Sequence, residues 1–219
     1  MTMKRLTRRG FIIGASGVVL GAASPARAGQ GVALSGRAFG GAWRVVLGAQ
    51  KDARALADEI GTVLSAMDRV FSPFRPDSAL SRFNRAATTG WVDVGATFSS
   101  VAAEALRVAA ISGGAFDPSV GPDVARYGFG PIAGSRAGSY KGFEVGEGRL
   151  RKGGAGLSLD LCGIAKGHAV SAVASCLEAH GVADFLIEIG GEVTARGLAP
   201  SGSAWRIGIA DPVAGGVHA

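Results

Sequence analysis

The sequence has 219 residues, of which 47% are hydrophobic, and a formal net charge of +6. Five of its 23 basic residues and none of its 17 acidic residues lie in residues 1–28, so the remainder carries 18 basic against 17 acidic residues. This near-neutral balance removes the main support for a nucleic-acid partner. About 190 residues then remain, enough for one domain with a substantial core or two small fused units.

Residues 1–28 are typical of an export signal. They begin with basic residues, continue as an apolar run over residues 10–23 that is too short to span a bilayer, and end in a small-x-small cleavage site at 26–28. The arginine pair at 8 and 9 followed by Phe11 is the twin-arginine signature, with a general secretory signal or an uncleaved anchor as alternatives. We therefore expect an exported, periplasmic protein whose mature domain spans residues 29–219.

The first half of that domain shows clear strand and helix periodicities. In chain order they predict strands over 32–39 and 42–47 around a Gly40-Gly41 turn, an amphipathic helix over 53–71, a loop with two prolines over 71–77, a short helix through Asn84 capped by Asp77 or Ser78, a strand over 90–94 and a helix over 97–112.

The second half begins with a rigid loop over residues 115–122, which ends in a Gly121-Pro122 turn. Asp117 precedes a proline and is held extended, so it can present its acid to a ligand or form a simple Asx turn. The further expected elements are a surface loop over 132–139, a hairpin of 140–145 with 149–152, a strand from residue 157, a helix over 165–177, and strands over 184–189, 193–196 and 204–209. Strands, helices and strands in this order predict an α+β domain.

Residues 157–170 form the stretch around which the chain is organised. A strand, a tight turn and a helix start in this order aim backbone N–H groups and a positive dipole end at one point, where phosphate commonly binds. Asp160 and Lys166 flank the turn, so a carboxylate and an ammonium group can both face the bound group. The alternative is an ordinary strand–helix junction with a solvated lysine.

The cysteine and histidine residues are few. Cys162 and Cys176 form no disulfide framework, and we expect two buried thiols. The three histidines show no Cys/His spacing typical of zinc.

Six stretches, in the same order as in the family, resemble the FAD:protein FMN transferases of the ApbE family. They are Phe71-Ser72-Pro73-Phe74-Arg75-Pro76-Asp77-Ser78 with Leu80-Ser81-Arg82-Phe83-Asn84, residues 113–122, Tyr127-Gly128-Phe129-Gly130, residues 159–167, Ile189-Gly190-Gly191-Glu192-Val193 and Trp205-Arg206-Ile207-Gly208-Ile209. The resemblance extends over residues 39–212 and implies an α+β fold similar to tandem T-fold units.

The resemblance also implies an activity. Such enzymes move the FMN half of FAD onto a threonine or serine hydroxyl of a partner flavoprotein and release AMP, with Mg²⁺ offsetting phosphate charge. FAD is then the substrate, and the acceptor can bring the protein close to the outer side of the inner membrane.

Matching the family position by position implies the following site. The expected FAD contacts are Phe39, Phe74, Ala115, Phe116, Asp117, Asp160 and Lys166, and the backbone of Gly163 is the expected metal ligand. A core role is the alternative for Phe74. No catalytic base is assigned.

The sequence also departs from the family pattern. Cys162 stands where a small residue is usual, His168 where an aromatic is usual, and Phe39 where many members have methionine. The resemblance further implies a C-terminal section, with the remaining metal ligands, that does not follow Ala219. The alternatives to an active transferase are therefore an FAD-binding module without turnover and a fragment with an open sheet edge at residues 204–209.

Overall fold

The computed structural model describes residues 31–48, 50, 52–132, 138–210, 217 and 218. The export signal predicted over residues 1–28 and most of the surface loop predicted over 132–139 lie outside this described part. The elements in chain order are β1 Val32–Ala38, β2 Gly41–Leu47, α2 Ala53–Phe71, α3 Ala79–Arg85, β3 Val92–Asp93, α4 Ala96–Ile111, α5 Gly121–Arg126, the 3-10 helix η1 Tyr140–Gly142, β4 Phe143–Gly146, β5 Arg149–Lys152, α6 Cys162–Ala179, β6 Phe185–Ile189, β7 Glu192–Arg196, β8 Ile209–Ala210 and β9 Val217–His218.

The first hairpin, β1–β2, turns one residue earlier than predicted. Ala38 pairs with Gly41, so the two turn residues are Phe39 and Gly40, both with positive φ (52° and 74°). Two positive φ angles are the mark of a type I′ turn, which matches the twist of the flanking strands. The turn places Phe39 at the tip of the hairpin, half-buried.

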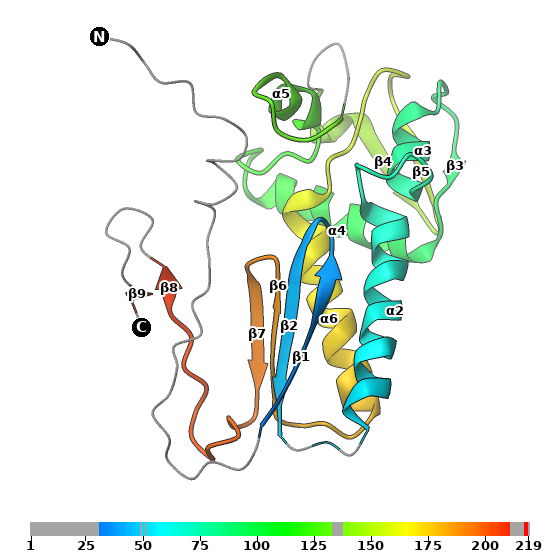
Figure 1. The fold of residues 1–219 in the computed structure, drawn as a ribbon. Coiled ribbons are helices and arrows are strands. Elements are labelled where there is room, and N and C mark those ends of the chain that lie inside the picture. Colours follow the sequence, from blue (N-terminus) through cyan, green and yellow to red (C-terminus); the bar gives the residue numbers. More distant parts are fainter. Residues whose placement is uncertain (1–30, 49, 51, 133–137, 211–216, 219) are drawn as a thin grey trace.

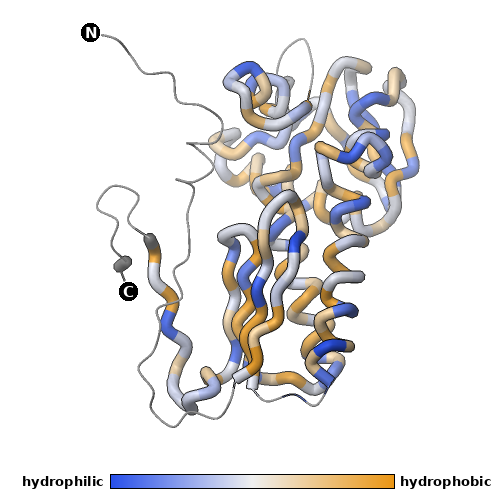
Figure 2. Tube along the Cα trace, viewed as in Figure 1, coloured by the Kyte–Doolittle hydropathy of each residue, from blue (hydrophilic) through white to orange (hydrophobic). Residues whose placement is uncertain are grey.

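An antiparallel sheet of order β1-β2-β6-β7 forms the larger layer. Helices α2 and α6 lie side by side against one face of this sheet (Figure 1). Alternate residues of β2, including Trp43, Val45 and Leu47, point into the core between sheet and helices. Hydrophobic residues follow the strands and the helix faces packed on them (Figure 2). Burial of this apolar surface is the main force that holds the layer together.

A second, smaller layer lies beyond one end of the sheet. It contains the three-stranded sheet β3-β5-β4 together with α3 and α4 (Figure 1). Its core gathers the rings of Phe71, Phe83 and Phe98. Met67 of α2 packs against the cores of both layers, so α2 connects them.

The strand predicted from residue 157 is wrong. Residues 157–161 form no regular secondary structure, and several of their backbone groups bind elsewhere. The Asn84 side chain accepts from the Leu159 N–H and donates to its carbonyl, both at 2.8 Å, and the Asp160 N–H donates to the Pro118 carbonyl at 2.7 Å. The following helix begins at Cys162, three residues earlier than predicted, where Asp160 Oδ1 accepts from the Cys162 N–H at 2.9 Å.

Two other predictions need correction. The Gly121-Pro122 turn is the start of the short helix α5, whose first turn tolerates proline because the N–H groups there need no intrahelical acceptor. The strand predicted over 204–209 is reduced to β8 at Ile209–Ala210, which pairs with β9. Among the described residues, no helix has both the length and the apolar character of a membrane span.

Candidate functional site

Two adjoining cavities lie where the two layers meet, and together they contain every residue predicted for the site. The larger, about 530 Å³, is lined by Phe39, Phe74 and Lys166, and the smaller, about 270 Å³, by residues 115–117, Asp160 and Gly163. Cys162 at the start of α6 lines both. Segments that are far apart in sequence therefore meet at the N-terminal end of α6.

The larger cavity is mainly apolar. Phe39 comes from the β1–β2 turn, Phe71 from the end of α2, and Phe74 from the proline-bounded loop that follows. Phe74 is 71% exposed, which excludes the core role held open for it. An exposed aromatic ring at the edge of a cavity of this size suits a planar ring system.

Cationic groups border the same cavity. Lys166 Nζ donates to the Gly190 carbonyl at 3.0 Å and lies 3.5 Å from Glu192 Oε1, so the lysine reaches across to the β6–β7 turn. It is not directed at Asp160, as the sequence interpretation had allowed. Arg75 also lines the cavity, and its Nε is buried with no hydrogen-bond partner in the described part of the chain.

Arg75 lies in the stretch at residues 71–78 that resembles the family, but it was not predicted as a site residue. Its guanidinium pairs with Asp77 at 2.9 Å and lies 3.7 Å from Asp68, and the Asp77 contact raises the pKa of Arg75 above its usual value. The arginine is thus held at the cavity edge by two carboxylates. Only the fold brings Asp68, on α2, to this position.

Asp117 is fixed in the smaller cavity by two backbone groups. Its Oδ1 accepts from the Ser119 N–H at 2.8 Å and its Oδ2 from the Tyr140 N–H at 3.2 Å. The first bond is the Asx turn that the sequence left open, and the side chain still lines the cavity. The two interpretations of Asp117 are therefore compatible.

Phe116, Asp160 and Gly163 complete the smaller cavity. A Cβ added to Gly163 would come within 3.1 Å of Phe116 Cε2, so the missing side chain lets the ring lie against the first turn of α6. The hydrogen bond from Asp160 N–H to Pro118 joins this helix start to the loop that holds Asp117. Asp160 and Asp117 thus belong to two directly connected segments.

The two cysteines are free, and neither is among the fully buried residues. Cys162 is exposed and Cys176 half-buried, so the expectation of two buried thiols is wrong. The surrounding protein desolvates the Cys162 sulfur, and together with Asp160 this raises the pKa of the thiol to about 12. Cys162 is therefore protonated at neutral pH and a weak nucleophile.

Two residues that were not predicted for the site, Asn84 and Lys152, bind the backbone of residues 157–159, just before α6. Asn84 binds the backbone of Leu159, as described above. Lys152 is 1% exposed, and its Nζ donates to the carbonyls of Phe83 (3.4 Å), Asn84 (3.0 Å) and Leu157 (3.1 Å). Burial lowers the pKa of Lys152. Asn84 is the last residue of the family-like stretch at residues 80–84, so the sequence carried some signal for it. Nothing in the sequence indicates that Lys152 is buried.

This arrangement offers carboxylates in one cavity, cations and aromatic rings in the next, and a helix start between them. A dinucleotide presents complementary groups, because its two planar rings flank a diphosphate. The helix start is partly occupied by the protein itself, since Asp160 takes the Cys162 N–H. Phosphate binding there would rely on the cationic side chains as well as on the helix dipole.

The chain is similar to proteins of a known family. The model of the ApbE family matches residues 39–219. The chain is 34% identical over 209 residues to a FAD:protein FMN transferase of Klebsiella pneumoniae, covering 87% of this chain and 59% of that protein, and 34% identical over 174 residues to one of Vibrio cholerae, covering 74% and 52%. It thus spans little more than half the length of these relatives.

Solved structures give the same result. The flavin transferase ApbE of Vibrio cholerae superposes with a TM-score of 0.79 at 32% identity, covering 86% of this chain and 66% of that one. The flavinyl transferase ApbE of Pseudomonas stutzeri, in its apo form, gives 0.74 at 30% identity, covering 86% and 69%. Sequence match and structural match agree over most of the chain, which belongs to the ApbE family.

Proposed function

We propose that this protein transfers the FMN half of FAD to a threonine or serine hydroxyl of a partner flavoprotein and releases AMP. The relatives named FAD:protein FMN transferase support a flavin transferase. The observation that carries the proposal is the meeting of residues 115–117 with the start of α6, which places two carboxylates beside an aromatic, cation-lined cavity.

The proposed reaction is a single phosphoryl transfer. The bond from the FMN phosphorus to the bridging oxygen breaks, and a bond from that phosphorus to the hydroxyl oxygen forms. AMP leaves with the bridging oxygen, and the hydroxyl proton is lost to a base or to water. Such a transfer depends mainly on positioning and on offsetting charge, so few side chains are needed.

The residues that line the two cavities take the following roles. Phe39 and Phe74 contact a ring of FAD, Lys166 and Arg75 face its phosphates, and the loop at 115–117 and Asp160 orient the nucleotide. The carboxylates of Asp117 and Asp160 in the smaller cavity are oxygen ligands of the kind Mg²⁺ prefers, and a bound Mg²⁺ would offset diphosphate charge. A carbonyl oxygen has two lone pairs, so that of Gly163 can serve as a ligand although the residue is helical.

We also propose that the protein acts outside the cytoplasm. The twin-arginine pattern in residues 1–28 supports export. Its acceptor would then be a periplasmic protein or a membrane protein whose acceptor threonine faces the periplasm.

The test is transfer of flavin to an acceptor in vitro. The chain is incubated with FAD, Mg²⁺ and a flavoprotein that carries an acceptor threonine, and flavin fluorescence is read on the acceptor in a denaturing gel. Fluorescence on the acceptor, lost when its threonine is replaced by alanine, is the expected result. FAD binding without transfer would leave only a flavin-binding module, and no FAD binding would overturn the proposal.

Asp160 is tested in the same assay. Asp160→Asn keeps the side-chain volume but removes the charge, and we expect at least about tenfold weaker FAD binding or slower transfer, about 1.4 kcal/mol. Asp93→Asn is the matched control, because Asp93 is exposed on β3 and lines neither cavity. Equal affinity and rate in Asp160→Asn and the unaltered chain would remove Asp160 from the site.

A further inference from the structure

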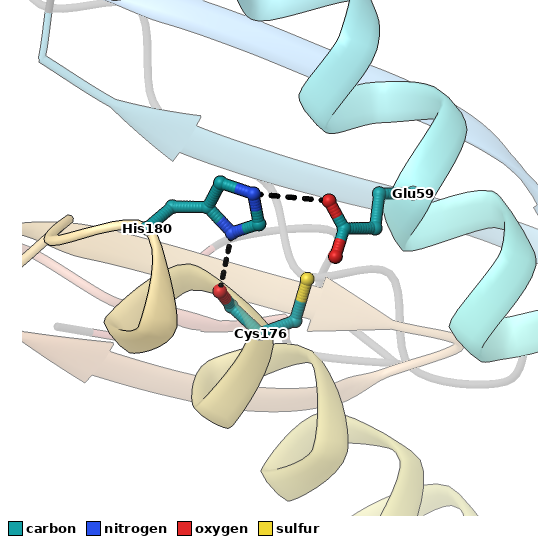
Figure 3. Close-up of side chains that lie close together, drawn as sticks. All are labelled: Glu59, Cys176 and His180. Carbon is teal, nitrogen blue, oxygen red and sulfur yellow. Dashed lines mark hydrogen bonds and ion pairs between the residues drawn. The ribbon is translucent and has the colours of Figure 1, made fainter.

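Glu59, Cys176 and His180 form a cluster outside the flavin site (Figure 3). One ligand atom from each residue, a carboxylate oxygen, the thiol sulfur and a ring nitrogen, lies within 4.8 Å of the other two. Glu59 belongs to α2, Cys176 to the last turn of α6, and His180 to the residue that ends it. The cluster therefore joins the two helices that cover the large sheet.

The cluster lies far from the two cavities. The helices run in opposite directions, so the beginning of α2 lies beside the end of α6, whereas the flavin site uses the end of α2 and the beginning of α6. Twelve residues separate Glu59 from Phe71, which at 1.5 Å per residue is about 18 Å along the helix. None of the three residues lines either cavity.

Each ring nitrogen of His180 lies close to an oxygen acceptor. Nδ1 lies 2.9 Å from the Cys176 carbonyl, and Nε2 lies 3.0 Å from Glu59 Oε2 (Figure 3). Both neighbours are acceptors, and a neutral imidazole carries only one N–H. In the tautomer whose Nδ1–H donates to the carbonyl, the lone pair of Nε2 points toward the Glu59 carboxylate, so both groups can be ligands of one cation. A backbone carbonyl that orients the ring in this way is the usual support of a histidine metal ligand.

The spacing and chemistry of the three groups point to one class of ion. Cys176 and His180 are separated by four positions at a helix end, where side chains lie on the same face. Thiolate, imidazole and carboxylate together match zinc and similar divalent transition metals, whereas Mg²⁺ prefers oxygen ligands alone. Glu59 and His180 are half exposed, at 50% and 45% of their side chains, so an ion can enter from solvent and keep water as a fourth ligand.

We propose that Glu59, Cys176 and His180 bind a zinc-class divalent ion that links α2 to α6. The ion replaces the thiol proton of Cys176, which is released to solvent, and no group is oxidised or reduced. Since the same helices carry the flavin site at their other ends, the bound ion would stabilise the packing on which that site depends. The proposal does not require the chain to transfer flavin.

The test is a titration of the reduced, untagged 219-residue chain with Co²⁺, followed by absorption spectroscopy. We expect a thiolate-to-cobalt charge-transfer band in the near ultraviolet, visible bands typical of four-coordinate cobalt, and loss of both when Zn²⁺ is added. Zn²⁺ should also raise the midpoint of thermal unfolding. Absence of a thiolate band at excess Co²⁺ would overturn the proposal.

Variants assign the band to the cluster. Cys176→Ser should abolish it, and His180→Gln and Glu59→Gln should each weaken Co²⁺ binding by about tenfold or more. Cys162→Ser is the matched control, because it removes the other free cysteine at the opposite end of the same helix and should leave the spectrum unchanged. A band that persists in Cys176→Ser, or disappears in Cys162→Ser, contradicts the assignment, and circular dichroism checks that each variant is folded.

Discussion

The exposed ring of Phe74 lies at the edge of the larger cavity. Large apolar side chains at 71% exposure gain little from burial, and this one sits at the edge of a cavity between two prolines that stiffen its loop. A rigid loop presents the ring in place, so a flavin or adenine ring can stack on it at a small cost in conformational entropy.

We predict that Phe74→Ala weakens FAD binding about tenfold, or about 1.4 kcal/mol, within the range measured when a ring that stacks on a base is removed. The free energy of unfolding should change by less than about 0.5 kcal/mol, because the side chain is mostly exposed. Quenching of flavin fluorescence gives the affinity and urea unfolding the stability. Tyr127→Ala, which removes another exposed ring that lines neither cavity, serves as control. An FAD affinity that Phe74→Ala leaves intact would exclude stacking.

At the scale of elements, residues 157–161 show what a periodicity can and cannot predict. The alternation of apolar residues predicted a strand that the structure does not form, although Leu159 and Leu161 are fully buried. The pattern does not show which groups accept and donate the backbone hydrogen bonds. Here the partners are Asn84 and Pro118, dozens of residues earlier in the chain. The Asn84 side chain and the Pro118 carbonyl take the backbone hydrogen bonds that a neighbouring strand would otherwise form.

We predict that Asn84→Ala destabilises the protein by roughly 2–4 kcal/mol, because the buried N–H and carbonyl of Leu159 both lose their partner. FAD binding should also weaken, since the adjacent Asp160 loses the support of its segment. Arg85→Ala, at the exposed end of the same helix, is the control and should cost much less. Urea unfolding and FAD titration measure the two effects. A loss of stability with unchanged affinity would mean that Asn84 supports the core but not the site.

At the scale of the whole molecule, local patterns predicted the elements better than their assembly. The apolar spacing of α2 predicted Ala53–Phe71 with both ends correct, and the hairpin β4–β5 is also confirmed. Nothing local predicts that β6 pairs with β2 across more than 130 residues, or that Glu59 meets Cys176 and His180. The predicted site residues came from resemblance to a family, and only the fold shows that they line two cavities that meet at Cys162.

The contact of α6 with α2 holds a histidine, His168, whose titration should couple the stability of the whole protein to pH. His168 of α6 packs edge-on against the ring of Phe71 of α2, with ring centroids 5.9 Å apart, and Phe71 in turn stacks on Phe98 of the second layer. Burial against these rings lowers the pKa of His168, because the charged imidazolium is poorly solvated there. The unfolded chain therefore takes up a proton below about pH 6.5 that the folded chain takes up only at lower pH.

We predict that the free energy of unfolding falls as the pH is lowered through this window and that His168 has no such effect above it, because protons bound preferentially by the unfolded state reduce stability. His168→Phe keeps an aromatic ring against Phe71 and removes the titration. It should lose stability less steeply between about pH 7 and about pH 5 than the unaltered chain. Urea unfolding curves across this range measure the slopes. If the free energy of unfolding depends on pH equally in His168→Phe and in the unaltered chain, the titration of His168 does not affect stability.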